Sequence, residues 1–584
     1  MTIGHPYEDK SGQKLSVESG ADVFIEVLNA NGVKVLFINS GTDTFPIQET
    51  IAKFEAQGKI IPRVVLCPDE ATAVAAAHGY FVATREVQVV LVHVDAGTLN
   101  LGGNMHDAQR GRAGIVVCAG RAPMTFEGEM PGTRSMNIHW TQEQLDQAGI
   151  LRNFTKWDYE TRRPENIQHV IQRAFQVASS EPPGPVYVTM PREVLMEKIT
   201  EVVIPSANRF NSLVTPQADA SAIEEIADAL INARSPLIIT GQSGRNYSTV
   251  DSMIELAETV GSPVVSEPVH MNFPSTHPMY AGINSQPYIE TADVILSVDQ
   301  DVPYIPANGS PMKGAKIFHI DIDPIKPTIP LWVFPYDHIV HADSSKAIPL
   351  LIKVLNRKMG PSDSARVDER YQLIRESHEK EYMESIHLAQ SHEKNNKITP
   401  EYLSYCINEM TAESAAVIDE CVTNGKHVSN YVRRSKPGTY FKSGGSSLGW
   451  GLGAAMGIKL ADQERMVIAT VGDGAFIYGC PTSTLWASDV YNAPFLTIIY
   501  NNQIHNAPRE SLNAGYPDSY AKRTNNWVGM GLGPSVDFAL LAKACRAYGE
   551  TVVKPLQVRS ALMRGLSEVR SGRSAVIDVR LEMT

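Results

Sequence analysis

The sequence lacks any apolar run that approaches the roughly 20 residues of a membrane-spanning helix. Its first residues, MTIGHPYEDKSGQK, also lack the apolar core of a signal peptide. The sequence has fewer basic than acidic residues. It contains 52 Lys and Arg and 64 Asp and Glu residues, which give a formal charge of -12. We therefore expect no membrane partner, and the negative charge weighs against nucleic acid as a partner.

Cysteine is scarce, and its spacing fits no disulfide or metal pattern. A disulfide-stapled domain or a zinc site would show closer, repeated spacing, such as CxxC pairs. The cysteines therefore predict reduced thiols in a cytoplasmic protein. Low-complexity tracts and short-period repeats are also absent from the sequence. The six cysteines are Cys67, Cys118, Cys406, Cys421, Cys480 and Cys545.

The alternation of apolar strands and helices predicts the fold class. Apolar residues make up 43% and charged residues 20% of the 584 positions, which is ordinary for a folded enzyme of several domains. Runs such as VKVLFIN, PLIITGQ and AAVIDEC are largely apolar, which is typical of strands in a parallel sheet covered on both faces. We expect three doubly wound parallel-sheet α/β domains, the middle one Rossmann-like and the first and third alike. The expected boundaries are 1–197, 218–359 and 398–584, and the charged segment 360–397 is expected to be a solvated connecting helix.

The segment 466–503 carries the clearest chemical signal. An apolar run ends at the Gly-Asp-Gly triplet 472–474, a helix-like segment follows, and a second apolar run ends at Asn501 and Asn502. Parallel strands present their carboxyl ends at one sheet edge, so Asp473 and the asparagines should converge there. The glycines leave backbone amides open to an anion. Carboxylate and amide oxygens beside such a nest suit Mg²⁺ that holds a diphosphate.

The triplet, the spacer and the two asparagines resemble the diphosphate and metal motif of thiamine-diphosphate enzymes. Asp473 and Asn502 are 29 positions apart (502 minus 473), which lies within the tolerance of that motif. A Gly-Asp-Gly triplet alone would be only a turn, so the strand-helix-strand context carries the resemblance. The resemblance covers essentially the whole chain and implies thiamine diphosphate and Mg²⁺ as cofactors. It implies that the metal ligands are the side chains of Asp473 and Asn502 and the main-chain carbonyl of Ile504, and that the cofactor contacts include Thr423, Asn424, Gly472, Gly474 and Ala475.

Two further segments resemble the aminopyrimidine side of the same cofactor site. Glu70 opens a helix in PDEATAVAAAHGY, like the family's glutamate that hydrogen-bonds the aminopyrimidine ring. A buried carboxyl group can share a proton with a ring nitrogen, although a favourable charge at a helix start is the alternative. In SGGSSLGWGLGAAMG, Leu448 stands where the family has the bulky apolar residue that bends the cofactor. The carbonyl of Ser446 would accept the 4'-amino group, and the alternative for Leu448 is a core position.

The substrate side resembles the benzoylformate decarboxylase subgroup. LVHVDAGTLNLGGNMHDA places His93 23 residues after the glutamate (93 minus 70), where that subgroup has a substrate-facing histidine. Imidazole exchanges protons near neutral pH, and the alternative is a core histidine on a buried strand. NSGTDTFP places Thr42 where the subgroup has a serine, and Ile305 replaces a second histidine, which departs from the pattern. His106 and His505 are further candidates for the pocket lining, with a helix surface and a loop as the alternatives.

The resemblance implies an enzyme that cleaves or forms carbon-carbon bonds next to a carbonyl. We expect non-oxidative decarboxylation of a 2-oxo acid, or carboligation of an aldehyde or ketone to a 2-hydroxyketone. The alternatives are an acetolactate-synthase-type transferase, a 2-hydroxyacyl-CoA lyase and a flavin-dependent oxidase. TGQSGRN carries no clear flavin signature, and the extension of acyl-CoA members is missing after SAVIDVRL. Because the family's site straddles two subunits, we expect a homodimer at minimum and a homotetramer as the common assembly.

Overall fold

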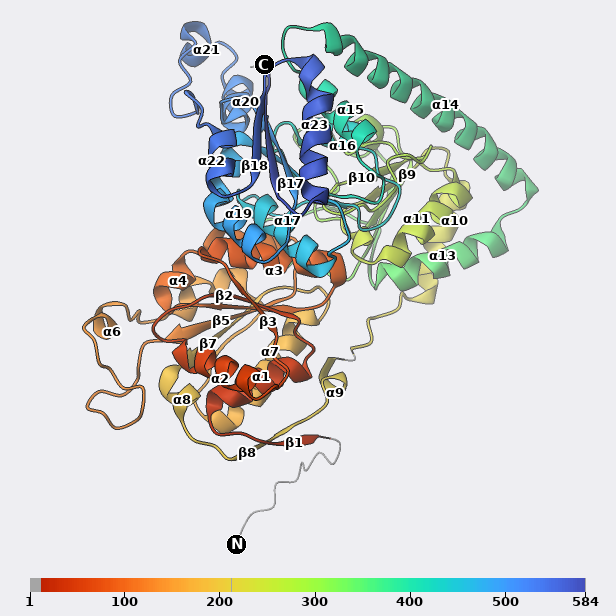
Figure 1. The fold of residues 1–584 in the computed structure, drawn as a ribbon. Helices are drawn as coiled ribbons and strands as arrows, with labels where there is room; N and C mark the ends of the chain where they lie inside the picture. The colour runs from red at the N-terminus through yellow and green to blue at the C-terminus, as the bar shows by residue number, and fades with distance from the viewer. Residues whose placement is uncertain (1–11, 212, 583–584) are drawn as a thin grey trace. The chain divides into compact units, whose positions relative to one another are not determined.

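The computed structural model describes residues 12–211 and 213–582. The prediction about a signal peptide therefore falls mostly outside the described residues. Three parallel sheets of six, five and six strands follow one another along the chain, with helices between the strands (Figure 1). The predicted fold class, three doubly wound α/β domains, is confirmed. The boundaries at 1–197, 218–359 and 398–584 stay a prediction.

The first sheet has the strand order β3-β2-β4-β5-β7-β6, and all of its strand pairs are parallel. Figure 1 shows α1, α2 and α7 on one side of this sheet and α3 and α4 on the other. Helices on both faces explain why β2, β4 and β5 are apolar and buried along their length. The strands are β2 (Val35–Asn39), β3 (Arg63–Leu66), β4 (Gln88–Val92), β5 (Ile115–Arg121), β6 (Asp158–Glu160) and β7 (Val186–Pro191). The helices include α1 (Gly20–Ala30), α2 (Phe45–Ala56), α3 (Glu70–Thr84), α4 (Asp95–Leu99), α5 (Gly102–Arg110), α6 (Ile138–Thr141), α7 (Ile167–Ser179) and α8 (Arg192–Met196).

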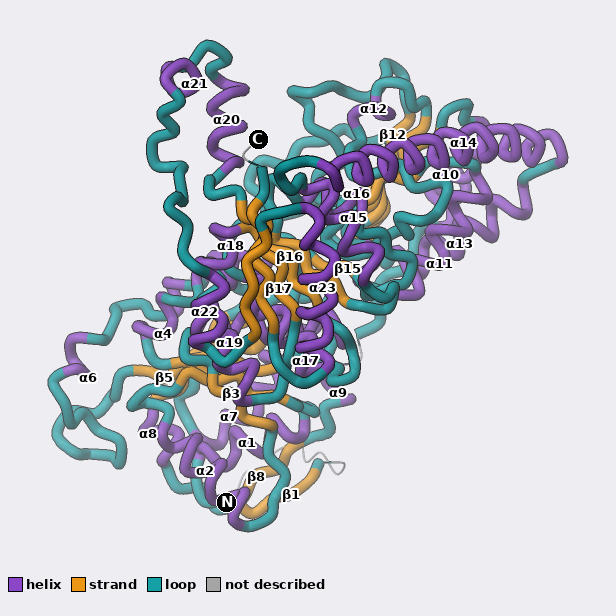
Figure 2. Tube along the Cα trace, turned by 45° about the horizontal axis from the view of Figure 1, so that its top comes forward, coloured by secondary structure: helices purple, strands orange, loops and turns teal. Residues whose placement is uncertain are grey.

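The third sheet repeats that topology. Its order is β15-β14-β16-β17-β19-β18, so both six-stranded sheets read 2-1-3-4-6-5 when strands are numbered along the chain. Figure 2 shows the neighbouring strands β16 and β17 in this sheet, with α23 beside them. The strands are β14 (Ala416–Glu420), β15 (Tyr440–Phe441), β16 (Val467–Gly472), β17 (Leu496–Asn501), β18 (Tyr548–Val552) and β19 (Ala575–Arg580). The helices include α15 (Pro400–Met410), α16 (Gly425–Tyr431), α17 (Trp450–Ala461), α18 (Asp473–Tyr478), α19 (Pro481–Val490), α20 (Asn506–Gly515), α22 (Phe538–Ala544) and α23 (Pro555–Arg570).

The central sheet has the order β10-β9-β11-β12-β13, which reads 2-1-3-4-5 along the chain and is a common doubly wound arrangement. The predicted solvated helix after it is α14 (Pro361–Ser391), in which only Ala389 is buried. The strands are β9 (Pro236–Thr240), β10 (Val264–Ser266), β11 (Val294–Val298), β12 (Lys316–Asp321) and β13 (His338–His341). The helices include α10 (Ala220–Asn232), α11 (Tyr247–Val260), α12 (Gln286–Ile289) and α13 (Ser344–Lys358).

Each sheet contains one edge strand that the sequence did not predict. β6, β13 and β15 are only two to four residues long, and β6 and β13 are largely exposed. A short strand with one open edge needs no unbroken apolar run, so periodicity gives no signal for it. A small antiparallel pair, β1 (Gln13–Ser16) with β8 (Glu201–Ile204), was also not predicted.

Contacts divide the chain into two compact units. The first contains the N-terminal sheet together with Ser443–Gln463 and Ile477–Ala493, and the second contains the central and C-terminal sheets. Small residues explain why α17 belongs with α3 in the first unit. A Cβ atom on Gly457 would lie 1.9 Å from the carbonyl oxygen of Ala76, and one on Gly79 would lie 2.2 Å from that of Ala454. The glycines therefore allow the two helix backbones to touch.

Two sequence predictions concern the whole chain. In the ranges 12–211 and 213–582, no helix is both long and apolar enough to cross a membrane. All six cysteines are free thiols, and four of them are buried, as expected for reduced core residues. Burial raises the pKa of the Cys406 thiol to about 11, so this thiol is protonated at neutral pH.

Candidate functional site

The carboxyl edge of the first sheet holds the predicted proton-exchanging histidine. The strand order reverses between β2 and β4, and doubly wound sheets bind ligands at such a switch point. His93 directly follows β4, and its Nδ1 is hydrogen-bonded to Oδ1 of Asp43, in the turn after β2. The His93 side chain is 24% exposed. His93 therefore lies at the sheet edge and is not enclosed in the core.

The surroundings of His93 favour its charged form. The hydrogen bond that the His93 ring donates to Asp43 raises the pKa of His93 above its usual range, although partial burial acts in the opposite direction. Thr42, the predicted substrate contact, belongs to the same turn and is exposed. This edge therefore carries a histidine whose charged form is favoured by Asp43, and the turn that contains Asp43 also carries the exposed Thr42.

Glu70 is the first residue of α3, and its side chain is buried. The start of α3 is capped by Asp69, which accepts from the backbone amides of Ala71 and Thr72, so Glu70 is not the capping group. Oε2 of Glu70 instead accepts a hydrogen bond of 2.9 Å from the side-chain amide of Asn100. A Cβ atom on Gly97 would lie 3.1 Å from Oε1 of Glu70 and 3.2 Å from Cβ of His93. The fold thus brings Glu70 and His93 to the same small region.

The segment with Ser446 and Leu448 precedes α17 rather than opening it. Gly449 caps α17 with a φ of 99°, so the helix begins two residues after Leu448. Leu448 is only half-buried, which separates it from the core. His106 of α5 accepts a hydrogen bond of 3.3 Å from the backbone amide of Ser446, which fixes this segment. Burial lowers the pKa of His106, so the neutral ring can act as this acceptor.

At the carboxyl edge of the third sheet, Asp473 directly follows β16 and is buried. Its Oδ1 accepts from the amide of Gly474 at 3.0 Å, and its Oδ2 accepts from the amide of Gln503 at 2.8 Å. Burial is the largest influence and raises the pKa of Asp473 despite these hydrogen bonds. In the described part of the chain, no Lys or Arg side chain forms an ion pair with Asp473. A desolvated carboxylate of this kind is suited to a cation.

The two asparagines of the motif point to different partners. Asn502 lies just past β17, and its Oδ1 accepts a 3.3 Å hydrogen bond from the amide of Ile504. Asn501 instead donates to Asp578 at 2.8 Å and to Ser535 at 3.2 Å. Asp473, Asn502 and Ile504 are therefore close along one edge, while Asn501 supports the sheet. Among the described residues, no group of three His, Cys, Asp or Glu side chains could hold a metal ion, but the predicted set needs only one carboxylate.

The glycine positions beside Asp473 fit a bound anion on one side. A Cβ atom on Gly472 would meet no heavy atom within 4 Å, so its surroundings are open. A Cβ atom on Gly474 would lie 2.7 Å from Cε1 of His505, so the ring of His505 packs against this backbone. Ala475 is buried in α18. The open cradle and the uncompensated carboxylate together fit a diphosphate with Mg²⁺.

The loop that carries Thr423 and Asn424 lies at the switch point of the third sheet. It follows β14, and the strand order reverses between β14 and β16. Thr423 and Asn424 are both half-buried. Asp419 holds the start of this loop, because its carboxylate accepts from the amide of Cys421 at 2.9 Å and pairs with Lys442 at 3.0 Å.

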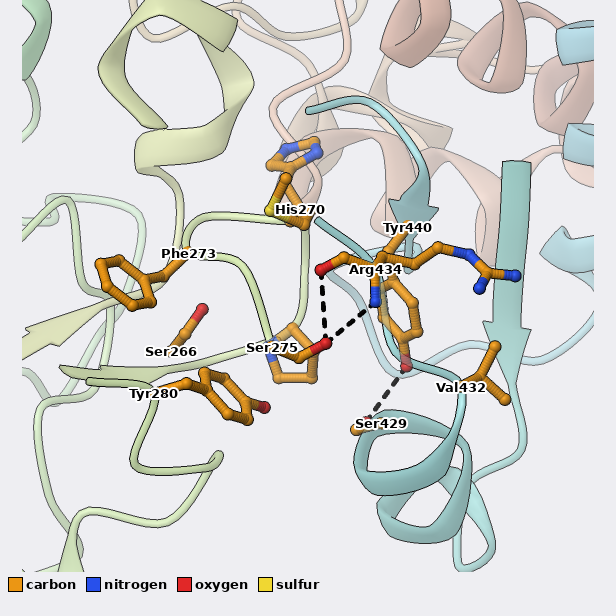
Figure 3. A pocket seen from close by; sticks show the side chains of 11 residues that line it. Ser266, His270, Phe273, Ser275, Tyr280, Ser429, Val432, Arg434 and Tyr440 are labelled. Carbon is orange, nitrogen blue, oxygen red and sulfur yellow. Dashed lines mark hydrogen bonds between the residues drawn. The ribbon is translucent and has the colours of Figure 1, made fainter. Parts of the chain in front are cut away.

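A small pocket lies next to Asp419 (Figure 3). Its wall includes Tyr440, whose hydroxyl donates to Asp419 at 2.6 Å and lies 3.1 Å from the hydroxyl of Ser429. Figure 3 shows the ring of Tyr280 across the pocket from Tyr440. Tyr440 therefore connects the pocket wall, through Asp419, to the loop that carries Thr423. The lining residues are Ser266, Pro268, His270, Met271, Phe273, Ser275, Tyr280, Ser429, Val432, Arg434 and Tyr440.

Ile305 lies in the loop after β11 of the central sheet and is 52% exposed. The switch point of this sheet, between β9 and β11, is filled by the protein's own charges. Arg245 and Asp299 are both buried and form an ion pair of 2.7 Å. Lys326, also buried, pairs with Asp321 at the end of β12. The buried acids at this edge are therefore paired with Arg or Lys, whereas no Lys or Arg of the described residues forms an ion pair with Asp473 at the third edge.

Sequence reasoning missed the groups that support the predicted residues. Asp43 pairs with His93, Asn100 pairs with Glu70, and Asp419 supports the start of the loop that carries Thr423 and Asn424. Asp43 stands in the turn SGTDTFP and Asp419 at the end of AAVIDE, so their positions after strands were the available signal. Asn100 follows a short helix and gives no signal in the sequence.

Three domain models match the chain in order. They are the N-terminal TPP binding domain at residues 18–150, the central domain at residues 223–328 and the C-terminal TPP binding domain at residues 423–579, all of thiamine pyrophosphate enzymes. Thiamine pyrophosphate, or TPP, is another name for thiamine diphosphate. The first and third matches include Glu70, His93, Asp473 and Asn502.

Related proteins align over most of the chain. Acetolactate synthase isozyme 3 large subunit of Escherichia coli is 24% identical over 97% of this chain and 95% of its own length. Benzoylformate decarboxylase of Pseudomonas aeruginosa is 24% identical over 83% of this chain and 86% of its own length. The structure of Rhodococcus jostii 4-hydroxybenzoylformate decarboxylase shares the fold, with a TM-score of 0.77, 21% identity and coverage of 97% and 100% of the two chains. The chain therefore belongs to the thiamine pyrophosphate enzyme family, in the group that includes acetolactate synthase and benzoylformate decarboxylase.

Proposed function

We propose that this enzyme removes carbon dioxide from a 2-oxo acid without oxidation, and that it can also join the remaining fragment to an aldehyde or ketone to give a 2-hydroxyketone. The observation that carries this proposal is His93, which lies at a sheet switch point, is partly exposed and is paired with the buried Asp43. A protonated imidazole there can donate a proton to the oxygen of a substrate carbonyl.

The third sheet would hold the diphosphate end of the cofactor. Thiamine diphosphate, when bound, supplies the electron sink that allows a bond next to a carbonyl to break. The side chains of Asp473 and Asn502 and the carbonyl of Ile504 would bind Mg²⁺, because hard oxygen ligands suit this ion. The diphosphate itself would lie against Thr423, Asn424, Gly472, Gly474 and Ala475.

The first unit would hold the aminopyrimidine end. Glu70 would hydrogen-bond a ring nitrogen and share a proton with it, and Asn100 orients that carboxyl group. The carbonyl of Ser446 would accept the amino group, with Leu448 against the ring system. We propose that Glu70 comes from one subunit and the diphosphate site at Asp473 from the other, which requires a homodimer at minimum and fits a homotetramer.

The substrate would lie near His93, Thr42 and Ile305. Of these, His93 would move a proton at Nε2, whereas Thr42 and Ile305 would shape the pocket. Ile305 replaces a histidine of the benzoylformate decarboxylase subgroup, so we expect a less polar contact there and a different substrate preference.

The main alternative is a transferase of acetolactate-synthase type. It is favoured by the Escherichia coli relative, which aligns over nearly the whole of both chains. A 2-hydroxyacyl-CoA lyase and a flavin-dependent oxidase remain further alternatives. The ion pair of Arg245 and Asp299 at the central switch point weighs against the oxidase, because it fills the edge where a nucleotide would bind.

The deciding experiment is to incubate the enzyme, loaded with thiamine diphosphate and Mg²⁺, with a panel of 2-oxo acids in the presence and absence of an acceptor aldehyde. We expect carbon dioxide release from at least one 2-oxo acid without an acceptor. Release that depends strictly on the acceptor, or on a second 2-oxo acid, would favour the transferase. A purified protein without flavin absorbance would rule out the oxidase.

A further inference from the structure

The two carboxylate oxygens of Asp43 have different surroundings. The residue is 2% exposed, and its Oδ1 is hydrogen-bonded to Nδ1 of His93. Its Oδ2 is buried and has no hydrogen-bond partner among the described residues. A buried carboxylate with an unsatisfied oxygen is costly unless positive charge lies nearby. The arrangement therefore favours a proton on the His93 ring.

Two glycines leave the space that this pair needs. A Cβ atom on Gly41 would lie 2.0 Å from Nδ1 of His93, and one on Gly120 of β5 would lie 1.4 Å from Oδ2 of Asp43. Any other residue at either position would push the two side chains apart. The backbone on both sides of the pair is thus fitted to the contact.

The contact also decides which ring nitrogen is free. A carboxylate oxygen only accepts, so Nδ1 of His93 must carry a hydrogen whether the ring is neutral or charged. No described residue forms a hydrogen bond with Nε2 of His93. The partly exposed ring therefore has a single position for proton exchange, at Nε2.

Other charged groups near the pair come from four elements. Asp95 on α4 and Glu70 on α3 add weaker negative charge at His93. Arg192 on α8 and His139 on α6 interact electrostatically with Asp43, but Arg192 donates to the carbonyl of Thr133 at 2.6 Å. The pKa of His93 is nevertheless raised, first of all by the hydrogen bond that its ring donates to Asp43.

We propose that Asp43 is a positioning residue that holds a proton on Nδ1 of His93 and presents Nε2 as the atom that exchanges a proton with the substrate. Nε2 gives its proton to the substrate oxygen and recovers one when the product carbonyl forms again. Asp43 does not contact the substrate in this scheme. The role of Nε2 rests on the proposed function, whereas the pairing of Asp43 with His93 does not.

The pairing can be measured without cofactor or substrate. Protein labelled with ¹³C at Cε1 of histidine gives one signal for each ring, and the signal missing from His93→Gln belongs to His93. We expect Asp43→Asn to lower the pKa of His93 by about 1 to 3 pH units, because a contacting opposite charge has an effect of that size. Asp95→Asn should lower it less, and Asp146→Asn, which removes an exposed carboxylate paired with Arg152, should leave it unchanged. An unchanged pKa in Asp43→Asn would overturn the proposal.

The pH dependence of carbon dioxide release supplies the second measurement. Asp43→Asn should move the basic limb of kcat/KM to lower pH by the same amount as the His93 titration, with at least a tenfold loss at neutral pH. If Asp43→Asn does not fold, Asp43→Ser should give the same two shifts. Full activity of His93→Gln would refute the proposed role of Nε2 and leave the pairing intact. A profile that stays in place while the pKa of His93 falls would refute the positioning role alone.

Discussion

The first and third sheets arrange their strands in the same order, yet their carboxyl edges carry different chemistry. At the first edge, the titratable side chains have protein partners: His93 has Asp43, and Glu70 has Asn100. At the third edge, Asp473 accepts hydrogen bonds from backbone amides, and no Lys or Arg among residues 12–211 and 213–582 forms an ion pair with it. We propose that the first edge holds and moves protons and that the third edge receives an ion.

The central sheet sharpens the comparison. Its switch point has the same strand reversal, but Arg245 pairs with Asp299 and Lys326 pairs with Asp321, so the charges there are already matched. The shared topology therefore provides three similar carboxyl edges. The side chains at the strand ends determine which of these edges can bind a ligand or take part in a reaction.

The largest effect is expected at the ion-receiving edge. Asp473→Asn keeps the shape of the side chain and removes its charge, so the Mg²⁺-dependent affinity for thiamine diphosphate should fall by about 100-fold or more. Quenching of intrinsic fluorescence on titration with the cofactor measures this loss. The neighbouring asparagines provide a matched pair: Asn502→Ala should weaken cofactor binding, and Asn501→Ala should lower stability through Asp578 with little change in affinity. Equal losses from both alanine variants would contradict the assignment of Asn502.

At the proton-holding edge, Glu70→Gln should affect the rate rather than the binding. The amide keeps the contact with Asn100 but cannot exchange a proton, so we expect kcat to fall by about 10² to 10⁴-fold. Cofactor affinity should change by only a few-fold. Glu86→Gln, an exposed glutamate of the same unit, is the control and should behave like the wild type. Unchanged turnover in Glu70→Gln would remove Glu70 from the mechanism.

A smaller effect is expected where the diphosphate loop is braced. Tyr440→Phe removes the hydrogen bond to Asp419, and the loop with Thr423 and Asn424 should hold the cofactor about tenfold less tightly. Tyr280→Phe removes a hydroxyl from the opposite wall of the same pocket, where no described residue is bonded to it, and should leave the affinity unchanged (Figure 3). The ratio of the two dissociation constants is the measurement. A ratio near one would show that the brace does not reach the loop.

The sequence predicted the parts of the fold that are buried on two sides. Strands such as β4, β16 and β17 are apolar along their length, so their existence and direction follow from the runs in the sequence. Edge strands such as β6 gain less from burial and left no pattern. Helix α17 begins only at Trp450 because Gly449 takes a left-handed conformation, which the apolar pattern does not record.

The candidate site likewise contains residues that were predicted from the sequence and partners that were not. Asp473 was predicted from its place after a strand, and Glu70 from the family resemblance of the helix that it opens, and both positions are set by the local backbone. Their partners depend on how loops fold over the sheet edge. The contacts of His93 with Asp43 and of Glu70 with Asn100 join loops 50 and 30 residues apart, and local periodicity carries no information about such pairs.

The smallest expected effect concerns stability. It tests whether folding raises or lowers the pKa of each of two histidines. The pKa of His93 is raised in the folded chain, so its pairing with Asp43 stabilises the protein below the usual histidine pKa of 6.5. That contribution disappears as pH rises through the higher folded pKa. His93→Gln should therefore lower the denaturation midpoint more at pH 5.5 than at pH 9.

His106 is expected to show the opposite pH dependence, because burial lowers its pKa and protonation then opposes folding. The cost of His106→Gln should accordingly be greater at pH 9, where the neutral ring holds Ser446, and smaller at pH 5.5. Urea midpoints of the three proteins at the two pH values measure both differences, and the same sign for both variants would contradict the assigned environments.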